Sequence, residues 1–323
     1  MEIEIPRSTS PVNIKVVGVG GGGCNTVRHI AEAAPKNEIE YLCLDTHWPP
    51  AKEVLRSIHY IQIGKAKTKG LGSGANPETG MLAAKESQND ISDALHGTDM
   101  VIFAAGMGGG TGTGAVQIVA DAAKNIHLLT VGFVTVPFSF EGMTRIKRAW
   151  DGIHALIQAV DSLIVIPNEN LKRLDPHQIT MANAFAYVDD ILGKGIQSVL
   201  EIINTNGFIN LDFADIQAVM KSAGYARMGI GQADGPNCAE KAAKMAISSP
   251  LHDRPVEAAS GIIINFTCSP DSTLDDIERA SALIAQSAHP DATVIWGVRF
   301  DESMKESMRV IVIATGFQEK TVI

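Results

Sequence analysis

The sequence has no apolar run long enough to cross a bilayer and no excess of basic residues. Runs such as "GIIINF" (261–266) fall far short of the roughly 20 residues that a membrane-spanning helix needs. The N-terminal "MEIEIPRSTSPVNIK" contains no apolar stretch of the signal-peptide kind. The net charge of −9, without a basic stripe, argues against binding to a nucleic-acid backbone. We therefore expect a cytoplasmic protein that binds neither nucleic acid nor, directly, a membrane.

Cysteine and aromatic residues are scarce as well. No cysteine belongs to a C-x-x-C pair and no histidines follow at zinc-finger spacing, so we interpret all four as buried, reduced thiols. They are Cys24, Cys43, Cys238 and Cys268. Aromatic residues make up 5% of the chain and hydrophobic residues 45%, which predicts an aliphatic core rather than a disordered chain. The 323 residues suffice for one large domain or two ordinary ones.

The first half alternates short apolar runs with segments of helical pattern. The runs are mostly apolar throughout, as is typical of strands buried on both faces of a parallel sheet. Strands are predicted at 13–19, 39–45, 58–64, 100–106, 128–136 and 162–168, and helices at 24–34, 78–95, 113–125 and 142–160. This alternation predicts an α/β fold with a doubly wound parallel sheet.

A longer apolar periodicity follows. Apolar residues within 177–204 step by three or four, which predicts one long central helix despite two glycines. Its apolar face comprises Phe185, Val188, Leu192, Ile196, Val199 and Ile203. Helices expected at 212–223, 237–248 and 272–288, with strands at 261–268, 293–300 and 309–317, indicate a smaller mixed α/β domain. The short polar break before the last strand suggests that the last two strands form an antiparallel pair.

The first of two glycine clusters is "GVGGGGCN" (18–25), between a strand and a helix. Gly18, Gly20 and Gly23 fit G-x-G-x-x-G, and Asp45 ends the next strand, as in dinucleotide-binding proteins. The free N–H groups of a helix N-terminus attract phosphate, and glycine permits its close approach. Taken alone, this cluster leaves an NAD-dependent dehydrogenase open.

The second cluster is "AAGMGGGTGTGAV" (104–116), again between a strand and a helix. It adds hydroxyls at Thr111 and Thr113, which one dinucleotide site does not require. Neither cluster contains Gly-Lys-Ser/Thr, which excludes a Walker A loop. Two such loops predict a polyphosphate held from two sides by backbone N–H groups, hydroxyls, helix dipoles and a metal ion.

These motifs resemble the tubulin/FtsZ superfamily, and within it the bacterial FtsZ branch of cell-division GTPases. "GGGTGTG" (108–114) matches the signature loop, and the resemblance extends from Asn13 to Phe317. The other matching stretches are "GLGSGANPETG" (70–80), "PFSFEG" (137–142), "VDSLIVIPNENL" (160–171), "NLDFADIQAVM" (210–220), "AISSPL" (246–251) and "VIATGF" (312–317). The implied organisation is a GTP-binding domain (12–176), a central helix (177–204), a C-terminal domain carrying the catalytic loop (205–317) and flexible ends (1–11 and 318–323).

The resemblance implies a GTP/GDP site and assigns its residues. Those cradling the phosphates are Gly21, Gly22, Gly108, Gly109, Gly110, Thr111, Gly112 and Thr113. Gly72, Gly74 and Ala75 lie in a loop that senses the γ-phosphate, and Glu141 and Arg145 contact ribose and phosphate. The guanine-reading positions are Asn25, Asn168, Phe185 and Asp189. A carboxylate at Asp189 can accept both N1–H and the 2-amino group of guanine, which adenine lacks.

The stretch "NLDFADI" carries the implied catalytic residues. Asp212 and Asp215 stand three residues apart at a helix start, where simple N-capping would be the ordinary interpretation. The resemblance instead implies that Asn210, Asp212 and Asp215 enter the nucleotide pocket of the next subunit and polarise the attacking water. GTP hydrolysis would then need head-to-tail self-assembly into a filament. Mg²⁺ is implied through the phosphates and water, with no direct protein ligand.

Three departures from the family pattern stand out. In "LDTHWPPAKEV" (44–54), Asp45 and His47 occupy positions typically held by Asn and Asp, and Trp48-Pro49-Pro50 is unusual. Cys24 replaces a small residue in the first glycine cluster, where it could be thiol-reactive. The third departure is the end at Ile323, without the linker and peptide by which FtsZ binds membrane adaptors. We expect no adaptor-binding tail, and favour a tail-less paralogue over a truncated FtsZ.

Two functions remain in competition. The first is a self-assembling cytoskeletal GTPase of the FtsZ type. The second is a specialised regulator with weak GTPase activity that binds a full-length FtsZ or serves an intracellular compartment. The altered loop after position 44 motivates the second.

Overall fold

A computed structural model describes residues 12–33, 39–49, 55–174, 179–204, 212–251 and 258–317. Ten strands form one sheet in the order β3-β2-β1-β4-β5-β6-β7-β10-β8-β9. The strands are β1 (Ile14–Val19), β2 (Ile39–Asp45), β3 (Ile58–Gln62), β4 (Met100–Gly106), β5 (Leu129–Val136), β6 (Ser162–Pro167), β7 (Gly224–Asp234), β8 (Gly261–Cys268), β9 (Thr293–Phe300) and β10 (Ser307–Thr315). The flexible ends predicted at 1–11 and 318–323 lie outside the described residues.

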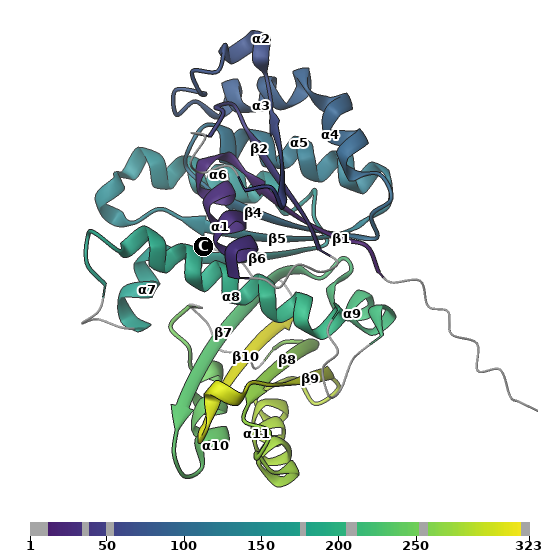
Figure 1. The fold of residues 1–323 in the computed structure, drawn as a ribbon, viewed down its shortest axis with the longest axis vertical. Coiled ribbons are helices and arrows are strands. Elements are labelled where there is room, and N and C mark those ends of the chain that lie inside the picture. Colours follow the sequence, from purple (N-terminus) through teal and green to yellow (C-terminus); the bar gives the residue numbers. More distant parts are fainter. Residues whose placement is uncertain are drawn as a thin grey trace, which may run out of the picture.

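The helices divide between two lobes, with α8 at the junction (Figure 1). Those of the first lobe are α1 (Gly20–Ala33), α2 (Lys65–Thr68), α3 (Pro77–Glu86), α4 (Gln88–Leu95), α5 (Thr111–Asn125), α6 (Met143–Leu156) and α7 (Asn168–Leu174). The remaining helices are α8 (Ala184–Asn204), α9 (Phe213–Met220), α10 (Cys238–Ile247) and α11 (Leu274–Gln286). In the described parts of the chain, short 3-10 turns lie at Ser139–Glu141 and Glu302–Met304.

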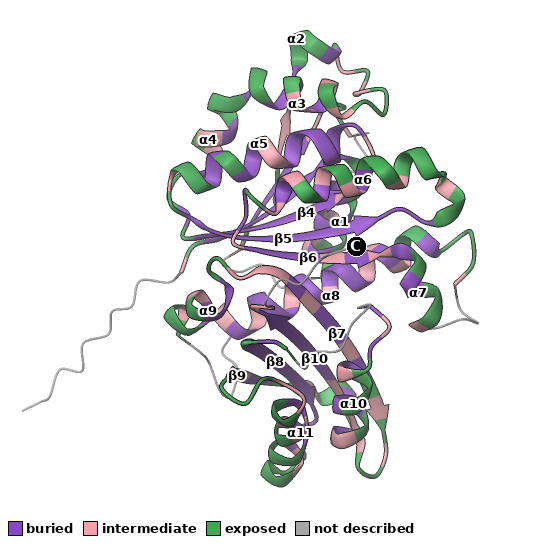
Figure 2. Ribbon diagram, turned by 180° about the vertical axis from the view of Figure 1, so that it is seen from behind, coloured by how far each residue is buried: buried purple, intermediate pink, exposed green. Residues whose placement is uncertain are grey.

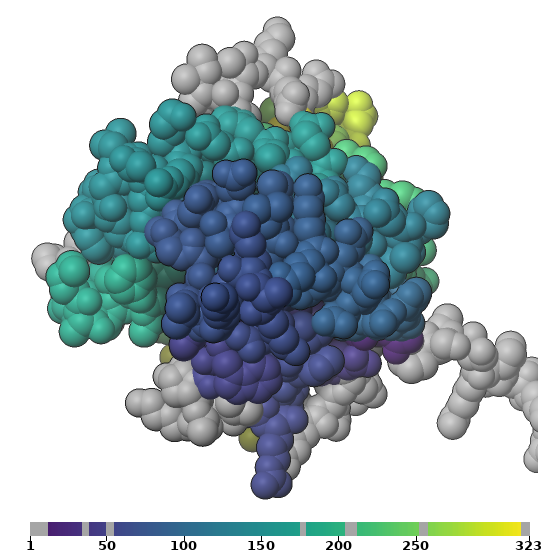
Figure 3. All heavy atoms as spheres, turned by 90° about the horizontal axis from the view of Figure 1, so that it is seen from above, coloured from purple at the N-terminus to yellow at the C-terminus, as the bar shows by residue number. Residues whose placement is uncertain are grey.

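The first lobe confirms the predicted α/β class. Strands β1 to β6 are parallel throughout, and most of their residues are buried, as continuous apolar runs predict (Figure 2). Helices α1 and α8 pack on one face of the sheet and α3 to α6 on the other. Seen from above, the segment containing α2, α3 and α4 covers that end of the molecule (Figure 3).

Strand β7 joins the two lobes and has no counterpart among the predicted strands. It pairs with β6 in parallel over three residues and then with β10 in antiparallel. The sequence does not predict this strand, because its glycines interrupt the pattern of apolar side chains by which strands are identified. They are needed for close packing of α10: a Cβ at Gly229 or Gly231 would lie 2.0 Å from a carbonyl oxygen of that helix.

The C-terminal lobe corrects one predicted pairing. Strands β9 and β10 are not neighbours, because β8 lies between them, antiparallel to β10 and parallel to β9. The turn between β9 and β10 is short, but β10 inserts between β7 and β8 and so buries its apolar residues on both faces. Helices α10 and α11 cover one face of these strands.

The central helix starts later than predicted. Residues 180–183 form a turn in which the Thr180 N–H donates to the Asn183 side chain (2.7 Å), and α8 begins at Ala184. Of the predicted apolar face, Val188, Leu192, Ile196 and Val199 are buried. The exceptions are Phe185, which is 50% exposed, and Ile203, which is half-buried. None of the helices in the described parts of the chain has the length and hydropathy needed to cross a membrane.

Candidate nucleotide site

The two glycine loops meet at the carboxyl edge of the parallel sheet. Strands β1 and β4 are neighbours with Val19 opposite Ala105, so α1 and α5 start side by side. The loops touch through their backbones: a Cβ at Gly20 would lie 2.6 Å from the Gly112 nitrogen, and one at Gly112 would lie 3.4 Å from the Val19 oxygen. Two helix N-termini with glycine approaches therefore point to one place, an arrangement suited to phosphate.

This contact predicts different effects for two alanine substitutions. Gly112→Ala should lower the free energy of unfolding by about 1–3 kcal/mol, because its Cβ meets backbone that cannot move aside. Gly109→Ala should leave stability unchanged, because nothing lies within 4 Å of the added Cβ, but should weaken nucleotide binding by blocking the close approach of a phosphate. Thermal melting and GDP titration separate the two effects, and equal stability loss in both variants would contradict the packing argument.

A third loop, residues 70–76, packs against the second glycine loop. Gly72 and Gly74 adopt positive φ, as does Ala75 at 57°, and the Ala75 carbonyl accepts a 2.9 Å bond from Arg148. A Cβ at Gly110 would lie 2.2 Å from the Ser73 hydroxyl, which shows how closely these loops fit. The predicted γ-phosphate loop is therefore adjacent to the predicted phosphate cradle.

Hydroxyl groups connect these loops at Thr111. Its Oγ1 lies 2.7 Å from that of Thr46 and 3.1 Å from the Ser73 hydroxyl. Thr113 instead accepts a 2.8 Å bond from the Gly108 N–H, so its buried hydroxyl holds the loop. The sequence did not identify Thr46 or Ser73, because nothing in the local pattern shows that they meet.

A cavity of about 230 Å³ extends from the glycine loops along the start of α8. It brings together all four predicted guanine-reading residues and the predicted ribose pair. They are Asn25, Asn168, Phe185, Asp189, Glu141 and Arg145, with Gly22 at the phosphate end. Glu141 and Arg145 form an ion pair at 3.1 Å, and Glu141 also accepts a 2.9 Å bond from the Phe138 N–H.

Two acceptors face this cavity from different elements. Asn168, the first residue of α7, is 4% exposed, and its Oδ1 is buried with no hydrogen-bond partner among the described residues. Burial raises the pKa of Asp189, on α8, to about 6, although a hydrogen bond from Thr26 opposes the shift. The half-exposed Phe185 ring packs edge-on against Phe138, with centroids 5.8 Å apart. The cavity therefore suits a planar base that donates hydrogen bonds.

Thr26 positions the Asp189 carboxylate, and sequence reasoning missed it. Its buried hydroxyl donates a 2.7 Å bond to Asp189 Oδ1 across 163 residues of chain. The pair becomes apparent only when α1 packs on α8, since no sequence pattern within either helix connects Thr26 with Asp189.

Removing this hydroxyl should weaken the binding of GDP. Thr26→Val should lower GDP affinity about fivefold, the typical effect of losing one hydrogen bond, and raise the pKa of Asp189 above about 6. Thr26→Ser keeps the donor and is the control. Calorimetric titration with GDP measures the affinity of both variants. A Thr26→Val variant with wild-type affinity would exclude this positioning role.

The two predicted catalytic carboxylates that the structure describes do not line the nucleotide cavity. Asp212 and Asp215 are exposed at the start of α9, and the Asp212 side chain makes no capping hydrogen bond. Helix α9 lies at the amino edge of the sheet, since its last carbonyl, from Met220, accepts a 2.6 Å bond from Ser162 at the start of β6. In Figure 1, α7 and α9 lie at opposite ends of α8. Asn210 lies outside the described residues.

Departures from the family pattern cluster beside the first glycine loop. The Asp45 side chain accepts a 2.7 Å bond from the Thr46 N–H, and burial raises the pKa of its carboxyl. The His47 ring contacts the Gly70 oxygen at 2.9 Å and so connects this segment to loop 70–76. A hydrogen bond with Cys43, together with burial, holds the pKa of Cys24 well above its usual range, so its thiol is not a reactive thiolate. Pro50 lies outside the described residues.

A parallel sheet with two glycine loops meeting at its carboxyl edge defines a nucleotide-binding α/β protein that uses no Walker lysine. The profile of the Tubulin/FtsZ family, GTPase domain, matches residues 13–175, and that of the FtsZ family, C-terminal domain, matches residues 224–318. The chain belongs to the tubulin/FtsZ family of GTPases. This membership removes the dehydrogenase alternative.

Solved structures agree with this assignment. An empty FtsZ dimer from M. jannaschii is 38% identical, with a TM-score of 0.89 over 95% of this chain and 89% of that chain. A tryptophan-to-tyrosine variant of the same FtsZ has the same identity and TM-score, over 95% and 92%. CetZ2 from Haloferax volcanii, a GTPγS-bound protofilament, is 16% identical with a TM-score of 0.79 over 96% and 94%, which supports the fold alone.

Proposed function

We propose that this protein is a GTP-dependent, self-assembling cytoskeletal GTPase of the FtsZ type that hydrolyses GTP where two subunits meet. The observation that carries this proposal is the separation of the cavity from Asp212 and Asp215. Helix α8 has 21 residues and therefore spans about 30 Å. The cavity lies at its first turns, whereas α9 lies at the far edge of the sheet. One molecule therefore cannot bring its own aspartates to its own nucleotide.

Guanine recognition is assigned to the two acceptors in the cavity. Asp189 accepts the N1–H and 2-amino donors of guanine, with Thr26 fixing the carboxylate. The unpartnered Oδ1 of Asn168 accepts a further donor, since leaving it unpaired costs free energy. Asn25 borders the cavity from α1, and Phe185 offers a ring face to the base. Adenine lacks the paired donors and leaves the Asp189 carboxylate unsatisfied.

Phosphate binding is assigned to the backbone of the two glycine loops. The residues are Gly21, Gly22, Gly108, Gly109, Gly110, Thr111 and Gly112, with Gly72, Gly74 and Ala75 next to the γ-phosphate. Arg145 and Glu141 lie on the ribose side of the cavity. Bound with the triphosphate, Mg²⁺ neutralises charge that develops on the phosphates. Among the described residues, the hydroxyls of Thr46, Ser73 and Thr111 lie together beside these loops and would be available to the metal or its water shell.

Catalysis is assigned to the α9 end of a second molecule. Asp212 and Asp215 of one subunit enter the pocket of the next and orient the attacking water, and Asn210 completes the set. The contact is heterologous, because the pocket edge of one subunit meets the α9 edge of the next. Repeating it therefore extends the assembly into a filament instead of closing it into a dimer. Such a filament would work in the cytoplasm and serve division or another cytoskeletal task.

A concentration series tests this proposal. Phosphate release from GTP with Mg²⁺, divided by protein concentration, should rise above a critical concentration, together with nucleotide-dependent pelleting and filaments in electron micrographs. A rate per molecule that stays constant while the protein remains monomeric would overturn it.

The second candidate is a regulator with weak GTPase activity that assembles with a full-length FtsZ. The contact of His47 with Gly70 favours it, because the altered segment is thereby tied to the loop assigned to the γ-phosphate. GTPase rates measured alone and in a mixture with a full-length FtsZ distinguish the two. A protein that is inactive alone but changes the partner's rate supports the regulator.

A further inference from the structure

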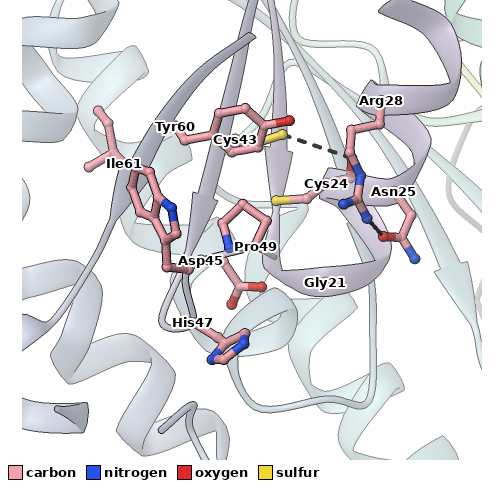
Figure 4. Close-up of a pocket in the computed structure, with 11 residues that line it drawn as sticks. Gly21, Cys24, Asn25, Arg28, Cys43, Asp45, His47, Pro49, Tyr60 and Ile61 are labelled. Carbon is pink, nitrogen blue, oxygen red and sulfur yellow. Dashed lines mark hydrogen bonds between the residues drawn. The ribbon is translucent and has the colours of Figure 1, made fainter. Parts of the chain in front are cut away.

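A second cavity borders the same first turns of α1 as the nucleotide cavity, and the function proposed above assigns no ligand to it. Its volume is about 150 Å³, and Asn25 lines both cavities. The other walls come from β2, β3 and the segment after β2 (Figure 4). Trp48 and Pro49, part of the altered segment, line it. The altered segment therefore forms part of the wall of a cavity beside the phosphate loop.

The greater part of this cavity is apolar and aromatic. The Trp48 and Tyr60 rings lie with centroids 6.2 Å apart and planes tilted by 54°. The Cys24 and Cys43 sulfurs face one another between α1 and β2 (Figure 4). A cavity of about 150 Å³ accommodates one benzene-sized ring. The size therefore selects a single planar ring, and the walls favour an aromatic one.

Asp45 supplies the polar group of the cavity. One carboxylate oxygen accepts the 2.7 Å bond from the Thr46 N–H, and the other points toward α1, 3.9 Å from where a Gly21 Cβ would lie. A carboxylate has about four lone-pair positions, so it can accept further donors. Burial raises the pKa of this carboxyl, and a ligand that donates to it compensates the lost hydration. Arg28 lies across the cavity, where its guanidinium donates to Asn25 Oδ1.

We propose that this cavity binds a planar, single-ring heteroaromatic cation with two adjacent N–H donors, such as 2-aminopyridine whose ring nitrogen has taken a proton from solvent. The donor edge pairs with Asp45, and the ring lies against Trp48 and Tyr60. A charged, bidentate pairing is stronger and more directional than a single neutral hydrogen bond. The site is separate from the guanine cavity, although Asn25 borders both.

The test is a titration of the full chain, saturated with GDP, with 2-aminopyridine. Tryptophan fluorescence and calorimetry should both show saturable binding with a dissociation constant on the order of 1 mM, as expected for so small a ligand. Benzene, which has no donor, should bind at least about tenfold more weakly. Binding that is seen only without GDP, and is lost when the chain is saturated with GDP, would place the ring in the guanine cavity and overturn the proposal.

Three variants locate the site. Asp45→Asn should weaken 2-aminopyridine about tenfold or more, because the amide offers one acceptor and a repelling NH₂ group. Trp48→Ala should weaken binding about fivefold, because one aromatic wall of the cavity is lost, with calorimetry as the readout and thermal melting to establish that the variant is folded. Leu274→Ala, at an exposed position on α11, is the matched control and should bind as the wild type does. Wild-type affinity in both cavity variants, or lost affinity in the control, would overturn the assignment.

Discussion

Asp212→Ala should lower GTP turnover by about 100-fold or more while leaving nucleotide affinity unchanged. This reduction in rate is typical when a side chain that positions the attacking water is removed. Affinity should persist because Asp212 is exposed at the amino edge of the sheet, far from the cavity at the carboxyl edge. Phosphate release above the critical concentration measures the first effect, and GDP titration of the monomer measures the second.

The matched control for this variant is Asp275→Ala. Asp275 is also an exposed carboxylate in the first turn of a helix, α11, but it belongs to the C-terminal lobe away from the proposed contact. Its removal should leave turnover unchanged. Wild-type turnover in Asp212→Ala, or an equal loss in Asp275→Ala, would refute the catalytic assignment.

Mixing two inactive variants tests whether the site is shared. Asp212→Ala keeps an intact pocket, and Asp189→Ala keeps an intact α9 edge. In a 1:1 mixture about a quarter of random head-to-tail contacts combine both intact halves, so turnover should partly return. Catalysis within one molecule predicts no recovery, because neither variant contains a complete site.

The first lobe could be predicted from the sequence because its information is local. Continuous apolar runs identified β1 to β6, and glycines between strand and helix identified the phosphate edge. Prediction failed where the determinants are distant in sequence. The glycines of β7 are explained only by the carbonyls of α10 that they meet, and the position of β10 only by the two strands that enclose it.

The same division holds for the site. Asp189 and Asn168 were assigned through family motifs, but the Thr26 hydroxyl that fixes Asp189 becomes visible only when α1 packs on α8. The Thr46–Thr111–Ser73 contacts join three loops that no periodicity connects. The cavity beside Trp48 likewise arises from three separate segments. Motifs locate the groups that touch the ligand, whereas the groups that hold them in place depend on tertiary packing.

Asp189 should make guanine-nucleotide affinity fall below pH about 6, the raised pKa of its buried carboxyl. Only the ionised form accepts both donors of guanine, so the affinity of the free protein should drop about tenfold per pH unit below that value. Asp189→Asn should lower affinity about 100-fold at pH 8, because one charged, bidentate acceptor is lost, and should remove this part of the pH dependence. GDP titrations from pH 5 to pH 8 measure both effects.

Stability should move in the opposite direction, which separates lost recognition from misfolding. The pKa of Asp189 in the folded protein lies above its ordinary value of 3.8, so the folded protein binds this proton more tightly than the unfolded chain. The stability from this group is present below pH 3.8 and is lost as the pH rises through about 6. Asp189→Asn should therefore melt at a higher temperature than the wild type at pH 8 while binding GDP far more weakly. A variant that loses binding and also melts lower would mean that Asp189 supports the fold, and guanine recognition would have to be assigned to other residues.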